Sequence, residues 1–171
     1  MYFRIAFFII SILFLGCAGF SNPVRQATPP DSSFPPTPVR LHFTGFGFYE
    51  KEKLKLRETI LQSGYTEDPN ADSLLEVKLE EIEHYYENIN LHRLNFVLSL
   101  VSVSLIPYRI DTDHKITYRY AKEKVIKESE YQLHLSQYRG ILILFLSPFY
   151  WPSRAFYQNI EETWKQESTN K

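Results

Sequence analysis

Cysteine is almost absent from this sequence, since the chain of 171 residues contains only Cys17. One cysteine excludes an internal disulfide and leaves a cysteine-based zinc site without its ligands. Charge of one sign is lacking too: 19 basic residues face 20 acidic ones, for a formal net charge of −1. This balance gives no basic surplus that would indicate nucleic acid or anionic lipid as a partner.

Apolar runs long enough to cross a bilayer are also missing. As a helix, the run at residues 5–15 would extend about 16 Å, well short of a hydrocarbon core of roughly 30 Å. Two further apolar stretches, at residues 94–106 and 141–151, would each extend about 16 to 20 Å. We therefore expect no stable transmembrane helix.

Catalytic and cofactor motifs are the third absence. The sequence has no nucleophile elbow, no complete phosphate-binding glycine loop and no histidine pair at metal-binding spacing. Glu80 and His84 could share one face of a helix or strand, but two ligands fall short of a zinc site, so we interpret both as solvated. We interpret residues 111–114 as a polar turn. The five histidines are scattered along the chain: His42, His84, His92, His114 and His134.

From these absences we predict a protein that is not an enzyme, with no catalytic, cofactor-binding or metal-binding residues and no cofactor. The alternative is an envelope enzyme whose site assembles from sequence-distant residues, because catalytic groups are defined by geometry and not by their order in the chain.

The start of the chain has the layout of an export signal. Arg4 gives a charged beginning, residues 5–15 give an apolar segment, and the small residue Gly16 precedes Cys17. The charge keeps the start of the chain on the cytoplasmic side while the apolar segment partitions into the bilayer. Residues 1–16 are therefore predicted to be a signal peptide.

The segment Leu-Phe-Leu-Gly-Cys at residues 13–17 resembles the lipobox of bacterial lipoproteins, in its loose, spirochaete-type form. Gly16 and Cys17 match the motif, whereas Phe14 and Leu15 stand where leucine and a small residue are usual. The resemblance implies that the Cys17 thiol receives diacylglycerol, that cleavage occurs between Gly16 and Cys17, and that the new amino terminus is acylated. An ordinary secretory signal and an uncleaved apolar anchor are the alternatives.

Acylation would determine where the protein resides. Each buried methylene contributes about 0.8 kcal/mol, so two or three acyl chains hold a protein on a membrane. We expect a protein that is lipid-anchored in the bacterial cell envelope and that contacts membrane lipid through acylated Cys17. Residues 18–21 include no acidic residue, which among enterobacterial lipoproteins implies the outer membrane.

Proline is concentrated just after the cysteine, where six of the ten prolines lie between residues 23 and 38. Proline lacks a backbone donor and favours an extended chain. Residues 17–38 are therefore predicted to be a lipidated, semi-rigid tether. A proline-rich ligand for a partner module is an alternative for residues 35–38.

Residues 39–171 have the length of a single domain. Alternating apolar residues predict a strand at 39–45, and helix-forming residues that end at Gly64 predict a helix at 49–63. The spacing of residues 73–87 fits a strand or a helix. Residues 71–79 resemble the strand that follows the first helix in small envelope lipoproteins, so we favour the strand.

The second half of this domain contains one further ambiguity. Residues 91–106 fit a buried helix or a strand. Residues 115–121 and 125–135 alternate as two strands of a hairpin, and residues 153–166 show helical spacing with Ser153 as the cap. We predict an α+β fold, with a small, mostly antiparallel sheet of about four strands and helices packed on one face.

The two apolar stretches of this domain allow two interpretations. Segments of 10 to 14 residues are more often buried than inserted, so core elements are the first. The second is contact with the membrane interface, with Phe149, Tyr150 and Trp151 at the level of the lipid headgroups. The layout resembles small envelope lipoproteins and implies a role in binding or supporting another envelope component, with an envelope protein as a partner.

Overall fold

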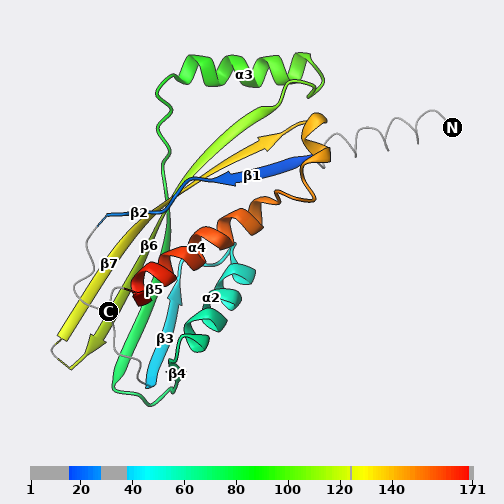
Figure 1. Cartoon of the computed structure of the whole chain (residues 1–171). Coiled ribbons are helices and arrows are strands. Elements are labelled where there is room, and N and C mark those ends of the chain that lie inside the picture. Colours follow the sequence, from blue (N-terminus) through cyan, green and yellow to red (C-terminus); the bar gives the residue numbers. More distant parts are fainter. Residues whose placement is uncertain (1–15, 28–37, 124, 170–171) are drawn as a thin grey trace. The chain divides into compact units, whose positions relative to one another are not determined.

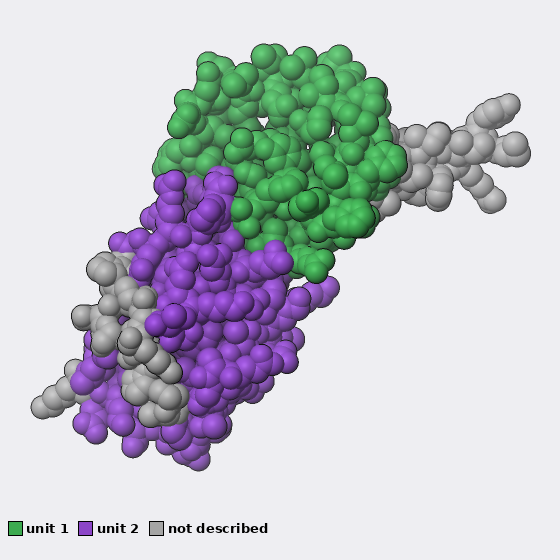
Figure 2. All heavy atoms as spheres, in the orientation of Figure 1, with its two compact units in different colours: residues 1–21, 83–112, 135–156 green, residues 22–82, 113–134, 157–171 purple. Residues whose placement is uncertain are grey.

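The structure is a computed structural model that describes residues 16–27, 38–123 and 125–169. Of the predicted signal peptide, only Gly16 lies within the described residues. The chain forms two compact units, each assembled from segments far apart in the sequence (Figure 2). Within the described residues, unit 1 contains residues 16–21, 83–112 and 135–156, and unit 2 contains residues 22–27, 38–82, 113–123, 125–134 and 157–169.

Unit 2 contains a strand, a helix and a second strand joined as a parallel crossover (Figure 1). The strands β3 (Pro38–Thr44) and β5 (Ser73–Ile82) pair in parallel. Parallel neighbours need a crossover connection, and the helix α2 (Glu50–Gln62) supplies it. The predicted strand, helix and second strand are confirmed.

The end of α2 follows the predicted stop. Gly64 adopts a left-handed backbone with φ of 100°, which favours glycine over residues with a side chain. The Ser63 hydroxyl donates to the Ile60 carbonyl at 2.7 Å and satisfies a carbonyl of the last turn. The chain then continues into the short strand β4 (Thr66–Glu67), which pairs with β3.

Two long neighbouring strands, β6 (Tyr108–Lys122) and β7 (Val125–Arg139), run through both units. In unit 2, β6 pairs antiparallel with β5, and the short strand β2 (Arg25–Gln26) pairs antiparallel with β7. The predicted hairpin is confirmed, and both strands are longer than predicted. Residues 111–114 lie inside β6, so the interpretation as a polar turn is wrong. Their polar side chains form hydrogen bonds with residues on neighbouring elements, and these partners cannot be identified from the local sequence.

The core of unit 2 lies between its sheet and two helices, α2 and α4 (Pro152–Thr169). Trp164 of α4 packs with its ring centroid 5.4 Å from that of Tyr118 on β6, and its indole nitrogen donates to Ser63 at 3.0 Å. These contacts place both helices of unit 2 on one face of the sheet. The buried residues include Leu56, Ile60, Leu75, Val77, Leu79, Ile116, Tyr118, Tyr120, Tyr131, Leu133, Ile160 and Trp164.

The α+β class and the mostly antiparallel sheet are confirmed, but the prediction of about four strands is wrong. Hydrogen-bonded neighbours follow the order β1-β7-β6-β5-β3-β4, and β2 also pairs with β7. The additional strands are two residues long or lie in the predicted tether, so a period-two pattern could not reveal them.

The first strand, β1 (Cys17–Ser21), lies in unit 1 and pairs antiparallel with the end of β7, with Cys17 opposite Arg139. The described part of the predicted tether is therefore not a free spacer. Residues 17–21 contain no proline, so every amide can donate to a neighbouring strand. The proline-rich residues 28–37 lie outside the described residues.

Unit 1 contains the helix α3 (Ile89–Val101), which confirms the helical alternative for this segment. Its first turn is capped by Asn88, whose side-chain oxygen accepts from the Leu91 amide at 3.0 Å. Among the residues that the structure describes, none of the helices has the length and apolar content needed to cross a membrane.

The second apolar stretch forms one short 3-10 helix, η1 (Leu142–Phe145), and then α4 begins at Pro152. Ser153 therefore lies inside the first turn, and the prediction that it caps the helix is wrong. Proline suits the first helical position because its φ is already helical and the missing donor is not needed there.

Candidate functional site

Exposed large apolar residues are concentrated in unit 1. All but five of those among the described residues belong to this unit, and the exceptions are Phe48, Leu54, Ile82, Val125 and Ile126. In unit 1 most of them come from α3, from the loop at 103–106, from η1 and from residues 149–151, and the others are Phe20, Tyr85 and Leu146. We call these four segments together the apolar surface of unit 1.

Helix α3 has the reverse of an ordinary amphipathic arrangement. Its inward side is polar: Ser99 is its buried residue, Asn95 donates to the Pro107 carbonyl at 3.1 Å, and His92 bonds to the Tyr108 hydroxyl at 2.8 Å. A surface helix normally buries its apolar stripe and exposes its polar one. The exposed apolar residues of α3 are Ile89, Leu91, Leu94, Phe96, Val97, Leu98, Leu100 and Val101.

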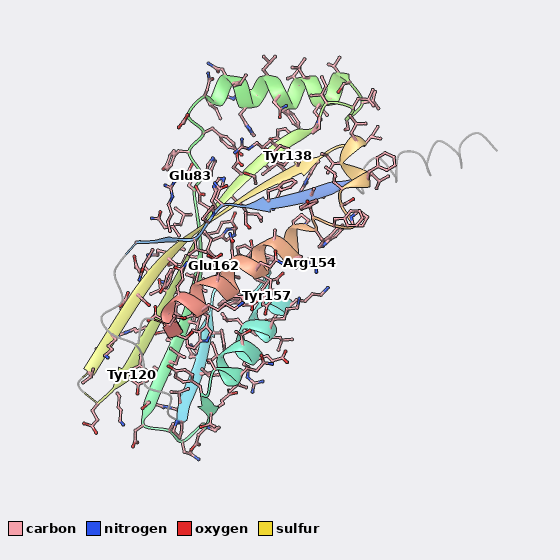
Figure 3. All side chains as sticks on the ribbon, in the orientation of Figure 1. Glu83, Tyr120, Tyr138, Arg154, Tyr157 and Glu162 are labelled. Carbon is pink, nitrogen blue, oxygen red and sulfur yellow. The ribbon has the colours of Figure 1, made fainter. Side chains whose placement is uncertain are left out.

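Figure 3 shows side chains of α3 on its side toward β6 and β7 and also on its outer side, where no other element covers them. The interpretation of residues 94–106 as a core element is therefore wrong. The polar groups of α3 already bond to the start of β6, so hydrogen bonds hold the helix. Most of its apolar side chains face outward, although the Phe96 ring lies 5.1 Å from the Tyr108 ring, measured between centroids.

The predicted aromatic segment is exposed as well. Phe149, Tyr150 and Trp151 are 71%, 48% and 52% exposed, so the core interpretation fails here too. The Tyr150 carbonyl accepts from the Gly19 amide at 2.7 Å, and the Tyr150 ring lies 5.0 Å from the ring of Phe20, measured between centroids. The segment is thus attached to β1, the strand that starts at Cys17.

Cys17 is a free, half-buried cysteine at the first position of β1. It lines a cavity of about 440 Å³ together with Phe96 and Leu100 of α3, Ser104 of the following loop and Gly140. A hydrogen bond from the Ile141 amide to the Ser104 carbonyl at 2.9 Å connects the loop after α3 with the residues that follow β7. Gly16 packs against Gly140, where a Cβ would lie 2.2 Å from the carbonyl oxygen.

Arginine supplies the charge within the segments of the apolar surface, and the exposed Glu87 lies just before the cap of α3. Residues 88–110 and 135–156 contain four arginines and no Asp or Glu. Arg109 is paired with Asp111, at 2.9 Å from Nε to Oδ1. Within the described part of unit 1, the exposed Arg93, Arg139 and Arg154 form no ion pair with an acidic side chain.

A cavity of about 840 Å³ opens beside the inward side of α3, in the size range of small-ligand sites. It brings together aromatic and polar residues from four separate parts of unit 1. The lining includes His84, Tyr86, His92, Asn95, Arg109, Asp111 and Tyr138.

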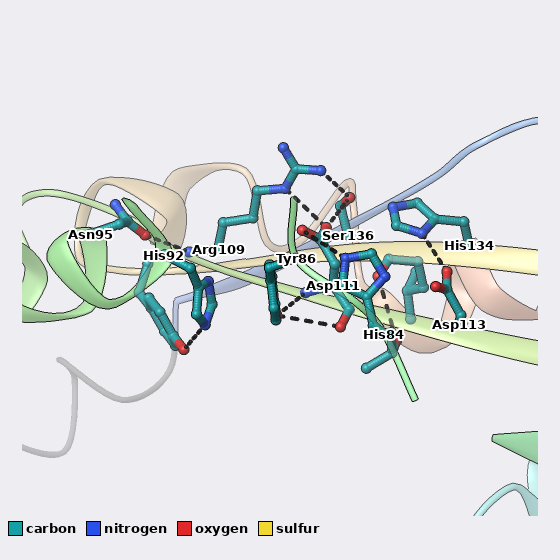
Figure 4. Close-up of polar contacts among 12 residues, drawn as sticks. His84, Tyr86, His92, Asn95, Arg109, Asp111, Asp113, His134 and Ser136 are labelled. Atoms are coloured by element: carbon teal, nitrogen blue, oxygen red, sulfur yellow. Dashed lines mark hydrogen bonds and ion pairs between the residues drawn. The ribbon is translucent and has the colours of Figure 1, made fainter. Parts of the chain in front are cut away.

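Asp111 is the centre of the polar network in this cavity (Figure 4). Its carboxylate is 6% exposed and accepts from Arg109 Nε at 2.9 Å and from the Ser136 hydroxyl at 2.6 Å. His84 Nε2 lies 4.0 Å from the second oxygen. The bond to Asp111 raises the pKa of Arg109, so the guanidinium stays charged.

Aromatic rings form one wall of the cavity. Tyr86 and His92 stack with centroids 3.8 Å apart, and the Tyr86 hydroxyl accepts from the Asp111 amide at 3.1 Å. Burial raises the pKa of Tyr108, the partner of His92. Many polar groups of this cavity bond to each other, which fixes their positions.

Unit 2 contains a second set of titratable residues. His134 Nδ1 lies 2.6 Å from Asp113 Oδ1, and the Tyr49 hydroxyl lies 2.9 Å from His114 Nε2. Burial lowers the pKa of His114, although the Glu81 and Asp113 carboxylates oppose that shift. Within unit 2, the pair of Asp113 and His134 supplies two of the four ligands that a structural zinc site takes.

The sequence analysis missed the Asp111 network and the ring stack. Asp111 was assigned to a turn, and its partners Arg109 and Ser136 are on strands that only the fold brings together. One signal was available for α3: the polar positions 92, 95 and 99 recur at helical spacing inside an apolar segment.

No known protein family and no curated protein matches the chain. Among solved structures, the chain is similar to a dodecamer of a PelC variant from Paraburkholderia phytofirmans, at 11% sequence identity and a TM-score of 0.39. The match covers 87% of this chain and 98% of that chain. Similarity at this level supports no conclusion about the fold or function of this chain.

Proposed function

We propose that this protein is a lipid-anchored, non-enzymatic lipoprotein of the bacterial cell envelope that binds or supports another envelope component. Acylation at Cys17, after cleavage behind Gly16, attaches it to membrane lipid. The absence of an acidic residue at positions 18–21 favours the outer membrane.

One observation carries this proposal: the unit that contains Cys17 also carries most of the exposed large apolar residues. Monomeric soluble proteins rarely expose extended apolar patches, and such patches mark contacts with membranes or partners. In this unit, Phe149, Tyr150 and Trp151 would contact the membrane interface, where aromatic side chains place an apolar ring beside the headgroups.

The attachment is tested by mass spectrometry of the mature amino terminus. We expect a peptide that begins at Cys17 and carries acyl chains, and we expect Cys17→Ser to lose them. An unmodified amino terminus that begins elsewhere would contradict the proposal.

The aromatic contact is tested by tryptophan fluorescence of the acylated protein in vesicles. Trp151 is half exposed whereas Trp164 is 1% exposed, so lipid contact should shift only the Trp151 emission to shorter wavelength. The variant Trp151→Phe is the control and should show no shift. An unchanged spectrum of the wild-type protein on vesicles would exclude this contact.

A second candidate function is an envelope enzyme, which the cavity of unit 1 favours because it collects His84, Arg109 and Asp111 from distant parts of the chain. Its test is turnover of envelope-derived substrates by the wild type and by Asp111→Asn. Turnover that the variant lacks would support the enzyme, and a stable partner recovered from detergent extracts without turnover would support the binding protein.

A further inference from the structure

The outward apolar side of α3 needs a partner that covers it. Its exposed residues include Leu91, Leu94 and Val101, which are 62%, 52% and 77% exposed. The inward side is already occupied by the bonds of His92 and Asn95 to the start of β6. Rotating the helix to bury its apolar side would break those bonds, so the apolar side is fixed outward.

The exposed charge in the same segments is entirely positive. Arg93 lies on α3 between Leu91 and Leu94, while Arg139 and Arg154 flank the stretch that contains η1 and Trp151. The net charge of the whole chain hides this local excess, because the acidic residues are mostly in unit 2. A second copy of the chain would bring arginine against arginine, whereas an anionic headgroup layer is complementary to the surface.

The attachment point lies at the same end of unit 1 as α3. Cys17 shares a cavity with Phe96 and Leu100, so acyl chains on its sulfur would emerge beside the helix. The helix has 13 residues, which gives about 20 Å in length, too short to span a bilayer but long enough to lie along its surface.

We propose that α3 lies in the interfacial layer of an anionic phospholipid membrane, with its outward apolar side in the acyl region and its arginine at the lipid phosphates. The inference rests on the proposed function for bringing unit 1 to a membrane, and it names the lipid surface as the partner of the apolar surface. Apolar burial gives the attraction, and each arginine near an anionic surface adds about fivefold in affinity.

The test uses residues 17–171 with Cys17→Ala, a non-acylated form that retains every described helix and strand. Flotation with vesicles of phosphatidylcholine, and with vesicles that also contain phosphatidylglycerol, measures binding without the lipid anchor. We expect flotation with the anionic vesicles, weakened by salt, and at least about fivefold weaker binding to the neutral ones.

Two pairs of variants locate the contact. The double variant Leu94→Glu/Val101→Glu should reduce binding at least about tenfold, since both charges enter the acyl region. Its control is Leu54→Glu on the exposed side of α2, which should leave binding unchanged. Arg93→Glu should weaken binding to anionic vesicles only, by about fivefold or more, while Lys51→Glu on α2 should not. All five positions are exposed, and circular dichroism with Trp164 emission verifies that each variant is folded.

No flotation of the folded non-acylated protein would overturn the inference. Flotation that the α3 variants do not change would also overturn it, because another part of the protein surface would then contact the lipid. Self-association in sedimentation that these variants abolish would overturn it as well, because the partner of α3 would then be a second copy of the chain. Acylation of Cys17 is measured separately by mass spectrometry, so an unmodified Cys17 refutes the proposed function without deciding the vesicle result.

Discussion

At the scale of single residues, unit 2 depends on polar groups buried inside an aromatic core. The Tyr131 hydroxyl donates to Glu167 at 2.6 Å, and both side chains are at most 1% exposed. Burial, with the neighbouring carboxylate, raises the pKa of Tyr131, so it remains a donor throughout the physiological range. A buried carboxylate is tolerated because this bond partly replaces its hydration.

Tyr131→Phe should therefore lower the free energy of unfolding by about 1.5 to 3 kcal/mol, the range for hydrogen bonds to charged groups. Denaturant titration followed by circular dichroism measures the change. Tyr120→Phe is the matched control, because it removes a bond between two neutral hydroxyls, to Ser73 at 3.2 Å, and should cost about 0.5 to 1.5 kcal/mol. Equal losses in the two variants would argue against a special role for the buried carboxylate.

His114 makes unit 2 sensitive to acid. Burial lowers the pKa of His114 below the ordinary value of 6.5, so the unfolded chain binds a proton at a higher pH than the folded one. The contribution of His114 is complete above pH 6.5 and decreases as the pH falls from there through the folded pKa. Unfolding titrations between neutral and mildly acidic pH should show a smaller decrease in stability for His114→Gln than for the wild type. Parallel pH profiles would contradict this assignment.

At the scale of elements, β1 decides whether the residues behind Cys17 are a spacer or part of the sheet. Gly19 lies so close to α4 that a Cβ would be 2.5 Å from the Cα of Pro152. Its amide also donates to Tyr150. A free tether would have neither this close packing against Pro152 nor this backbone hydrogen bond.

Gly19→Ala should accordingly destabilise the protein by about 1 to 3 kcal/mol, as an overpacked contact does. Gly47→Ala is the control, since a Cβ there meets nothing within 4 Å. Unfolding midpoints, together with hydrogen exchange of the amides at 17–21, measure the effect. If both variants keep wild-type stability and these amides exchange freely, the segment is a tether after all.

At the scale of the whole molecule, most exposed large apolar side chains belong to unit 1, and most acidic side chains belong to unit 2. In unit 2, charged side chains such as Lys115, which contacts Glu80 and Glu130 at 3.5 and 3.2 Å, occupy strand positions on the solvent side of the sheet. Exposed apolar residues are concentrated in unit 1. This segregation agrees with the membrane contact proposed for unit 1.

Membrane association should consequently have two components with different salt sensitivity. The acylated wild type should stay on membranes in high salt, because two or three acyl chains do not depend on charge. Cys17→Ser should be released to a large extent, because only the apolar side chains and screened arginines hold it. Fractionation of membranes before and after a salt wash measures this difference, and equal retention of both proteins would contradict it.

The sequence by itself determined the elements whose patterns are local. Period-two alternation located β3 and the hairpin, and helix formers ending at Gly64 located α2, because these signals depend on residues a few positions apart. The spacing at β5 fitted a strand and a helix, and a resemblance favoured the strand. The lipobox-like segment at Cys17 is local in the same way, and acylation stays a prediction. Tertiary structure alone decided the pairing of β1 with β7, the network around Asp111 and the outward orientation of α3. Each of these features depends on which distant strand or polar group completes a backbone or side-chain hydrogen bond. The sequence of an apolar segment does not indicate whether protein or lipid will cover it.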